Sequence, residues 1–148
     1  MKLTQINGLI GELKAIELFI SNGWDVSKPI NQTDYDLHIQ KEKKSYLIQC
    51  KFRTMGARGT VEIKNKRTKN FSKTVFVRRY KPYDERINYF TIYVPCVDKV
   101  YVVPYRLFKH KSSLTLRLIK SLNRQKKDVL YANRFHNPKW LSHIGSTQ

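Results

Sequence analysis

The chain has 148 residues, of which 41% are hydrophobic, and this is enough for one domain with a modest core. Its formal net charge of +18 favours a polyanionic partner. We find no long apolar run, no signal peptide and no single basic amphipathic helix, which argues against membrane binding and favours a cytoplasmic protein. The two cysteines, Cys50 and Cys96, are too few for a disulfide framework or a zinc site, and we expect both to be packed thiols.

The positive charge is unevenly distributed along the sequence. Residues 1–51 contain seven Lys and no Arg against six acidic residues, a net charge of +1. Residues 52–148 contain the remaining 22 basic residues against five acidic residues, a net charge of +17. This asymmetry suggests that carboxylates gathered in the first third do chemistry, while the rest of the chain contacts phosphates.

The first predicted element is a helix over about residues 5–22. Apolar residues recur at helical spacing through GLIGELKAIELFISNGW, and Gly23 is a plausible stop after it. The spacing then changes to two: Tyr35, Leu37 and Ile39 alternate with polar residues, and so does the run from Tyr46 to Phe52. We expect two strands joined by a charged turn.

A strongly basic segment follows, with ten Lys or Arg and one acid, Glu62, over residues 53–81. Short β-prone pieces at 60–63 and 74–77 predict a basic hairpin or flap. The run INYFTIYVPCVDKVYVVP predicts two buried strands with a break near Pro95 to Asp98. A short strand with alternating leucines is expected around residues 114–118, and nothing in the sequence indicates a second domain.

The central observation is Asp36 followed thirteen positions later by Gln49, Cys50 and Lys51. Side chains on one face of neighbouring antiparallel strands approach within about 5 Å, so Asp36 and Gln49 can offer oxygen ligands to one hard cation. Mg²⁺ prefers such ligands, and Lys51 would position the nucleophile or neutralise developing charge. Glu12, on the helix, is a further candidate carboxylate.

These residues resemble a known enzyme family. The run Gly11-Glu12, then Tyr35-Asp36-Leu37, then Ile48-Gln49-Cys50-Lys51 looks like the PD-(D/E)XK nuclease superfamily. Gln in place of the usual third-position acid, together with the downstream strand-like runs, is similar to the homing endonucleases encoded by group I introns of bacteria, including cyanobacteria. The resemblance covers roughly residues 6–135.

The resemblance implies an α/β, restriction-endonuclease-like fold, in which a mixed sheet is flanked by helices and carries the basic flap as an insertion. It implies one nuclease domain over residues 1–148, with a catalytic core at about 6–53. It also implies hydrolysis of both strands of a long double-stranded DNA target with Mg²⁺, for which Mn²⁺ can substitute, and assembly into a homodimer or homotetramer.

Carried over by position, Asp36 matches the metal-binding acid, Gln49 the replaced third position, Lys51 the catalytic Lys and Glu12 the helix acid of related nucleases. These four residues form the candidate catalytic set, and Glu12, Asp36 and Gln49 form the candidate metal ligands. A neutral amide at Gln49 lowers the negative charge available to hold a divalent ion, which would mean weaker metal binding or an inactive descendant.

The basic segment supplies the candidate DNA contacts. A β-ribbon fits the major groove, where Arg and Gln can read bases, so the 60–81 flap is the candidate for sequence recognition. The residues expected to contact DNA are Arg53, Arg58, Lys64, Lys66, Arg67, Lys69, Lys73, Arg78, Arg79 and Lys81.

Three other hypotheses stay open at this point. A structure-specific nuclease of the Holliday-junction-resolvase type would recognise branched DNA rather than sequence. A non-catalytic nucleic-acid-binding protein on the same scaffold would fit Gln49 and the positive charge. RNA is a further substrate class, because phosphate electrostatics do not distinguish it from DNA and the nine Tyr could stack on its bases.

Overall fold

The computed structural model describes residues 1–65, 67–70, 78–81, 86–108, 111–120 and 129–142. Helix α1 spans Leu3–Ser21, close to its predicted range, and ends before Gly23, whose positive φ of 84° suits glycine. No helix in these ranges is long and apolar enough to cross a membrane.

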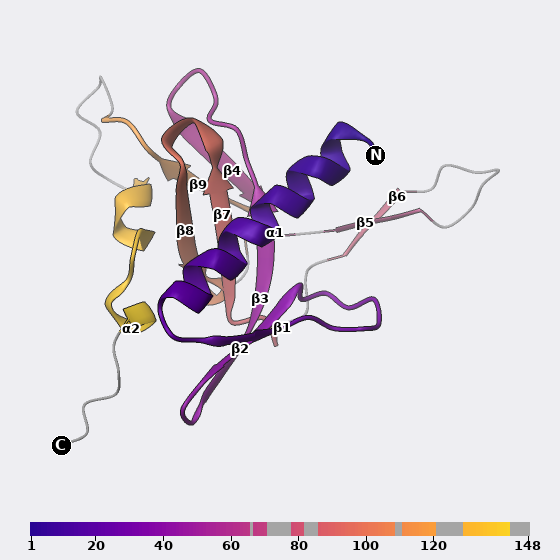
Figure 1. Cartoon of the computed structure of the whole chain (residues 1–148). Helices are drawn as coiled ribbons and strands as arrows, with labels where there is room; N and C mark the ends of the chain where they lie inside the picture. Colours follow the sequence, from indigo (N-terminus) through magenta and orange to yellow (C-terminus); the bar gives the residue numbers. More distant parts are fainter. Residues whose placement is uncertain (66, 71–77, 82–85, 109–110, 121–128, 143–148) are drawn as a thin grey trace.

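The larger sheet contains five strands in the order β1-β2-β3-β7-β8 (Figure 1). β3 and β7 are parallel and the other pairs are antiparallel, so the sheet is mixed, as predicted. β1, which pairs with β2, is a strand that the sequence pattern did not indicate. The strands are β1 (Asp25–Ser27), β2 (Leu37–Lys41), β3 (Lys44–Phe52), β7 (Tyr89–Val94) and β8 (Lys99–Pro104).

A second sheet has the order β10-β9-β4. Its strands are β4 (Thr60–Lys64), β9 (Ser113–Arg117) and β10 (Leu130–Tyr131), and the predicted strand at 114–118 corresponds to β9. β4 was predicted as part of a flap, but it pairs antiparallel with β9, fifty residues away in sequence. A separate two-stranded ribbon joins β5 (Arg67–Asn70) and β6 (Arg78–Lys81) and extends away from both sheets (Figure 1). The predicted β-prone piece at 74–77 lies outside the described residues.

Two apolar clusters hold these layers together. α1 covers one face of the larger sheet, where Ala15 and Phe19 of the helix pack with Leu37, Ile39 and Ile48. The second cluster joins the larger sheet to the smaller one and includes residues of β4, β7, β8 and β9. The larger sheet is therefore flanked by one long helix on one face and by the small sheet on the other.

The remaining helical elements are short. They are η1 (Pro95–Val97), η2 (Tyr105–Phe108), η3 (Ala132–Phe135) and α2 (Lys139–Ser142). η1 is the predicted break between β7 and β8, and it leaves Cys96 exposed, so the expectation of a packed thiol was wrong there. Cys50 is partly buried beneath α1, as expected.

Candidate active site

The carboxylate of Asp36 continues the hydrogen-bond ladder at the point where strand β2 begins. The pairing of β2 with β3 ends where Leu37 lies opposite Ile48. The next backbone amide of β3 that points towards β2 belongs to Cys50, and no residue of β2 lies opposite it. The Asp36 side chain fills that place: its Oδ2 accepts a 2.8 Å hydrogen bond from the Cys50 amide, while its own amide donates to the Ile48 carbonyl. The backbone of β3 therefore fixes the orientation of this carboxylate.

Gln49 lies opposite Asp36 when the same register is extended by one residue. Its side chain is buried, with 8% of its surface exposed. Within the described part of the chain, its Oε1 atom finds no hydrogen-bond partner, which is costly for a buried amide oxygen. An electropositive ligand at this oxygen would remove that cost.

Glu12 reaches the same region from helix α1, and the residue before it explains how. A Cβ added at Gly11 would lie 3.1 Å from the Lys51 carbonyl oxygen and 3.2 Å from the Phe52 Cβ, so the helix can approach β3 this closely only with glycine. The next side chain, Glu12, is only 19% exposed.

Lys28, in the loop after β1, forms an ion pair with Glu12 Oε1. This interaction raises the pKa of Lys28, and Asp36 and Cys50 act on it electrostatically in the same direction. A cation therefore already sits among the candidate metal ligands. Sequence patterns did not find Lys28, because it lies outside the alternating strands and belongs to no motif.

The pKa of the Asp36 carboxyl is raised, mainly by burial and also by the negative charge of Glu12. The Cys50 amide, Lys51 and Lys28 act in the opposite direction, because each stabilises the carboxylate. The Glu12 carboxylate thus disfavours the ionised form of Asp36, as a nearby like charge does. A bound cation would offset both this repulsion and the effect of burial on Asp36.

Lys51 is partly buried, and burial is the main cause of the fall in its pKa to about 8. Repulsion from Arg53 lowers the pKa further, and attraction to Asp36 opposes the change. At neutral pH the ammonium is still the major form, so Lys51 provides a positive charge beside the carboxylates. Lys51 is therefore electrostatically coupled to Asp36, and its catalytic role remains a prediction.

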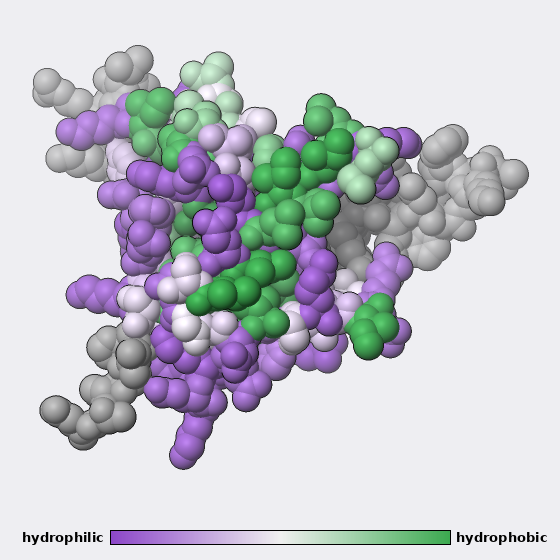
Figure 2. All heavy atoms as spheres, viewed as in Figure 1, coloured by the Kyte–Doolittle hydropathy of each residue, from purple (hydrophilic) through white to green (hydrophobic). Residues whose placement is uncertain are grey.

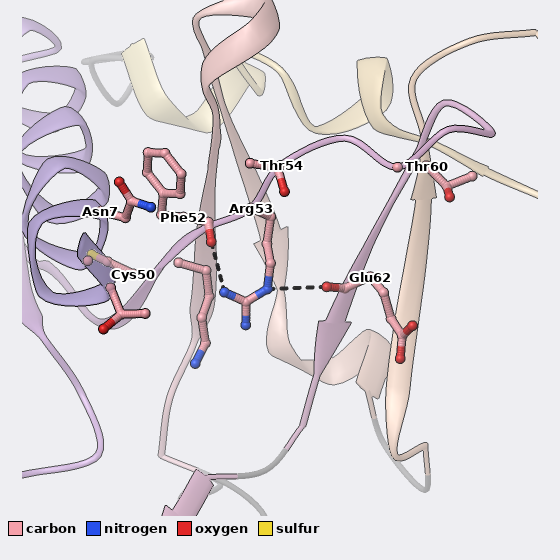
Figure 3. A pocket seen from close by; sticks show the side chains of 11 residues that line it. Asn7, Cys50, Phe52, Arg53, Thr54, Thr60 and Glu62 are labelled. Atoms are coloured by element: carbon pink, nitrogen blue, oxygen red, sulfur yellow. Dashed lines mark hydrogen bonds between the residues drawn. The ribbon is translucent and has the colours of Figure 1, made fainter. Parts of the chain in front are cut away.

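A cleft of about 720 Å³ opens next to these residues, between α1, the end of β3 and β4 (Figure 3). Thr4, Asn7 and Gly8 line it from the helix, and Lys51 lines it from β3. On the opposite side the Arg53 guanidinium donates to the Phe52 carbonyl at 2.8 Å and to the Glu62 carbonyl at 3.3 Å, as the dashed lines show. Arg53, a predicted DNA contact, thus also fastens β4 to the end of β3.

The residues present fit a hard divalent cation. Asp36 and Glu12 supply carboxylate oxygens, and Gln49 supplies a buried amide oxygen without a hydrogen-bond partner in the described ranges. Mg²⁺ selects this oxygen chemistry. The described residues contain no group of three or more His, Cys, Asp or Glu that could hold a metal, so the candidate site depends on the Gln49 amide as its third ligand.

The other predicted DNA contacts fall into three groups. Arg58 and Lys64 are exposed beside the cleft, before and at the end of β4. The backbone of the β5–β6 ribbon pairs Arg67 with Lys81, Lys69 with Arg79, and Asn70 with Arg78. The remaining two, Lys66 and Lys73, lie outside the described residues.

Comparison with known proteins identifies the family and the fold. Residues 3–138 match the family model described as PD-(D/E)XK endonuclease, whereas no curated protein matches significantly. Among solved structures, the chain is similar to a bacterial homing endonuclease, I-Ssp6803I, with a TM-score of 0.72 and 23% identity over 95% of this chain and 93% of that one. A likeness to MepB, at 18% identity over the same shares, has a TM-score of only 0.37 and supports no argument. Because the family match spans most of the sequence, this chain belongs to the PD-(D/E)XK endonuclease family.

Proposed function

We propose that the protein is a site-specific homing endonuclease that makes metal-dependent double-strand cuts in a long DNA target by phosphodiester hydrolysis. The observation that carries this proposal is the electrostatic coupling of the Asp36 carboxyl to Glu12 and Lys51, with Gln49 opposite Asp36 in the strand register and Lys51 lining the cleft. The similarity to a bacterial homing endonuclease supports the choice of this branch of the family, and we propose an origin in a group I intron as part of the same hypothesis.

Asp36, Gln49 and Glu12 would hold Mg²⁺ or Mn²⁺. When bound, the ion supplies a Lewis acid that polarises the scissile phosphate and stabilises the oxygen that departs. Hydrolysis places additional negative charge on the phosphoryl oxygens, and the Lys51 ammonium is placed to stabilise that charge. The hydrogen bond from the Cys50 amide keeps Asp36 oriented throughout.

The basic residues of the β5–β6 ribbon are the proposed DNA grip. The backbone register pairs basic residues, such as Lys69 with Arg79, and a DNA backbone supplies the negative charge that would neutralise this segment. A ribbon also fits the major groove. Cutting both strands calls for two active sites, which a homodimer or homotetramer provides.

A non-catalytic DNA-binding role is the second candidate. It is favoured by two observations, the neutral side chain at Gln49 and the Lys28 ammonium on Glu12, since both reduce the attraction of the site for a metal ion. Under this alternative the protein would bind DNA in a salt-sensitive manner and would make no cut with any divalent metal.

The deciding experiment is cleavage of a DNA library of randomised and candidate intron-insertion sites in Mg²⁺ or in EDTA, with a four-way junction as a separate substrate. Asp36→Asn is the test variant, because Asn keeps an oxygen that can accept from the Cys50 amide while losing the negative charge. We expect cuts at one long sequence, lost in EDTA and reduced at least about 100-fold in Asp36→Asn, with binding retained.

The other outcomes separate the alternatives. Preferential cutting of the junction would favour a resolvase, and binding without cuts would favour the non-catalytic role. The DNA grip is tested by replacing Lys69 and Arg79 with Gln, with the exposed Lys43 of the β2–β3 turn and Lys44 at the start of β3 as controls. Each lost phosphate contact should make the logarithmic salt slope of binding shallower by about 0.9.

A further inference from the structure

Helix α1 is apolar on two opposite faces. Gly11, Ala15 and Phe19 are buried against the larger sheet. A second row of large apolar side chains is left in solvent along the same helix, with exposed fractions of 71% at Leu3, 38% at Ile6, 42% at Leu9, 53% at Leu13 and 58% at Ile20. In Figure 2 hydrophobic surface gathers over α1. An extended apolar row left in solvent on a helix usually marks an interaction surface.

The spacing of the exposed row is that of a helix-packing seam. Ile6, Leu13 and Ile20 are seven residues apart, and Leu9 and the partly buried Ile16 form a second series seven apart. Apolar residues spaced alternately three and four positions apart lie on one side of a helix. Their side chains pack between those of a partner helix as knobs into holes. The spacing is also nearly symmetrical about Leu13. Ile6 and Ile20 lie seven positions before and after it, and Leu9 and Ile16 lie four positions before and three after.

The charge of the helix indicates the kind of partner. Within Leu3–Ser21 there is one Lys and there are two Glu, a net charge of −1 in a chain of +18. Lys14 is paired with Asp98 at 3.3 Å, and Glu12 is paired with Lys28. DNA or an acidic membrane would require basic residues here. Two copies of this strongly basic chain, in contrast, would meet with least repulsion along this helix.

We propose that the exposed row on α1 from Ile6 to Ile20, together with the partly buried Ile16, which also packs against the core, is the interface with a second copy of this chain. The two helices pack antiparallel about a two-fold axis near Leu13, so that Ile6 of one copy meets Ile20 of the other. A two-fold interface must be self-complementary, and the symmetry of the row about Leu13 meets this requirement.

This arrangement deepens the proposed endonuclease function and rests on it for its purpose. Glu12 is adjacent to Leu13 in sequence, so the axis would relate two candidate sites through their own helices. The cleft-lining residues Thr4, Asn7 and Gly8 lie on other faces of α1 and would remain open to DNA. The two sites could then address the two strands.

The first test is the mass in solution, measured without DNA by sedimentation for the full chain and for Leu13→Glu. The control is Ile30→Glu, because Ile30 is fully exposed and lies outside the row. We expect the wild type and Ile30→Glu to have at least twice the 17.6 kDa of one chain, and Leu13→Glu to dissociate at least 100-fold more readily with unchanged helix content. A monomeric wild type, or an assembly that Leu13→Glu leaves intact, would overturn the proposal.

The second test is disulfide trapping in a Cys96→Ser background, which removes the exposed native thiol. Ile6→Cys mixed with Ile20→Cys should cross-link to a heterodimer, whereas Ile30→Cys mixed with Ile20→Cys should not. Failure of the first pair to cross-link contradicts the antiparallel seam. Cleavage assays on the same variants keep the two proposals separate. If Leu13→Glu disrupts the dimer but the wild type cuts no DNA, the interface stands and only the endonuclease function is refuted.

Discussion

A Cβ atom added at Gly11 would lie 3.1 Å from the Lys51 carbonyl oxygen, so helix α1 and strand β3 meet backbone to backbone beside the candidate site. The neighbour is backbone and cannot rotate away as a flexible side chain would. The helix must therefore shift if Gly11 acquires a side chain, and Glu12 must shift with it.

Gly11→Ala and Gly8→Ala form a matched pair on the same helix. A Cβ at Gly8 would meet nothing within 4 Å, so Gly8→Ala should stabilise the protein by about 0.5–1 kcal/mol through helix propensity. Gly11→Ala should be less stable than Gly8→Ala in urea denaturation, and it should lower cleavage by less than the roughly 100-fold that a 1 Å displacement of a catalytic group costs, because the contact needs to open only slightly. Equal stability and equal activity of the two variants would contradict the close contact.

The sequence predicted the parts of this fold that depend on local periodicity. The helix and the alternation in β3 follow from apolar spacing, and Asp36 and Gln49 could be paired because alternation determines which side chains share a face. Strand β2 begins one residue after Asp36, so this carboxylate continues the strand ladder through its side chain, a role that alternation does not encode.

The features that sequence reasoning missed depend on contacts between distant segments. β4 was assigned to a flap because its neighbours in sequence are basic, whereas its strand partner β9 lies fifty residues later. Lys28 lies in a loop, and only the packing of α1 on β3 brings Glu12 to it. The exposed row on α1 was counted simply as helical periodicity, because a sequence does not show which apolar face becomes buried.

Lys28 is expected to compete with the metal ion for Glu12. Its ammonium pairs with that carboxylate, and it is 55% exposed, so the pair contributes only about 0.2–1 kcal/mol. Lys28→Gln should lower the Mg²⁺ concentration that gives half-maximal cleavage roughly two- to fivefold. Lys43→Gln, in an exposed turn, is the control for lost net charge. An unchanged or higher Mg²⁺ requirement in Lys28→Gln would show that Lys28 assists the site instead.

Lys51 gives the protein a pH dependence of stability with a definite sign. The pKa of Lys51 falls from 10.5 to about 8 on folding. Below about pH 8 both states carry the proton, and the cost of burying the charge is fully present. Between about pH 8 and 10.5 the unfolded chain binds more protons at this site than the native protein, so the contribution of Lys51 to stability improves as pH rises.

The measurement is the difference in free energy of unfolding between the wild type and Lys51→Met, in EDTA, from pH 7 to pH 10. As the pH rises from 7 to 10, the free energy of unfolding of the wild type should increase relative to that of Lys51→Met by on the order of 1–3 kcal/mol. Lys44→Met, at the exposed start of β3, controls for the titration of ordinary lysines. A difference that stays constant across this range would mean that Lys51 is not desolvated.

Gln49 decides how tightly the site can hold a metal ion, and two substitutions bracket its role. Gln49→Glu restores a third carboxylate beside Asp36 and Glu12, which should destabilise the protein in EDTA through like-charge repulsion and tighten Mg²⁺ binding about 10-fold. Gln49→Leu removes the amide oxygen and should weaken binding by about 10- to 100-fold. Because a ligand that binds only the native state stabilises it by mass action, the rise in Tm on adding Mg²⁺ should be largest in Gln49→Glu and smallest in Gln49→Leu. If all three proteins respond to Mg²⁺ equally, the buried Gln49 oxygen is not a ligand, and the non-catalytic DNA-binding role becomes the better account of this scaffold.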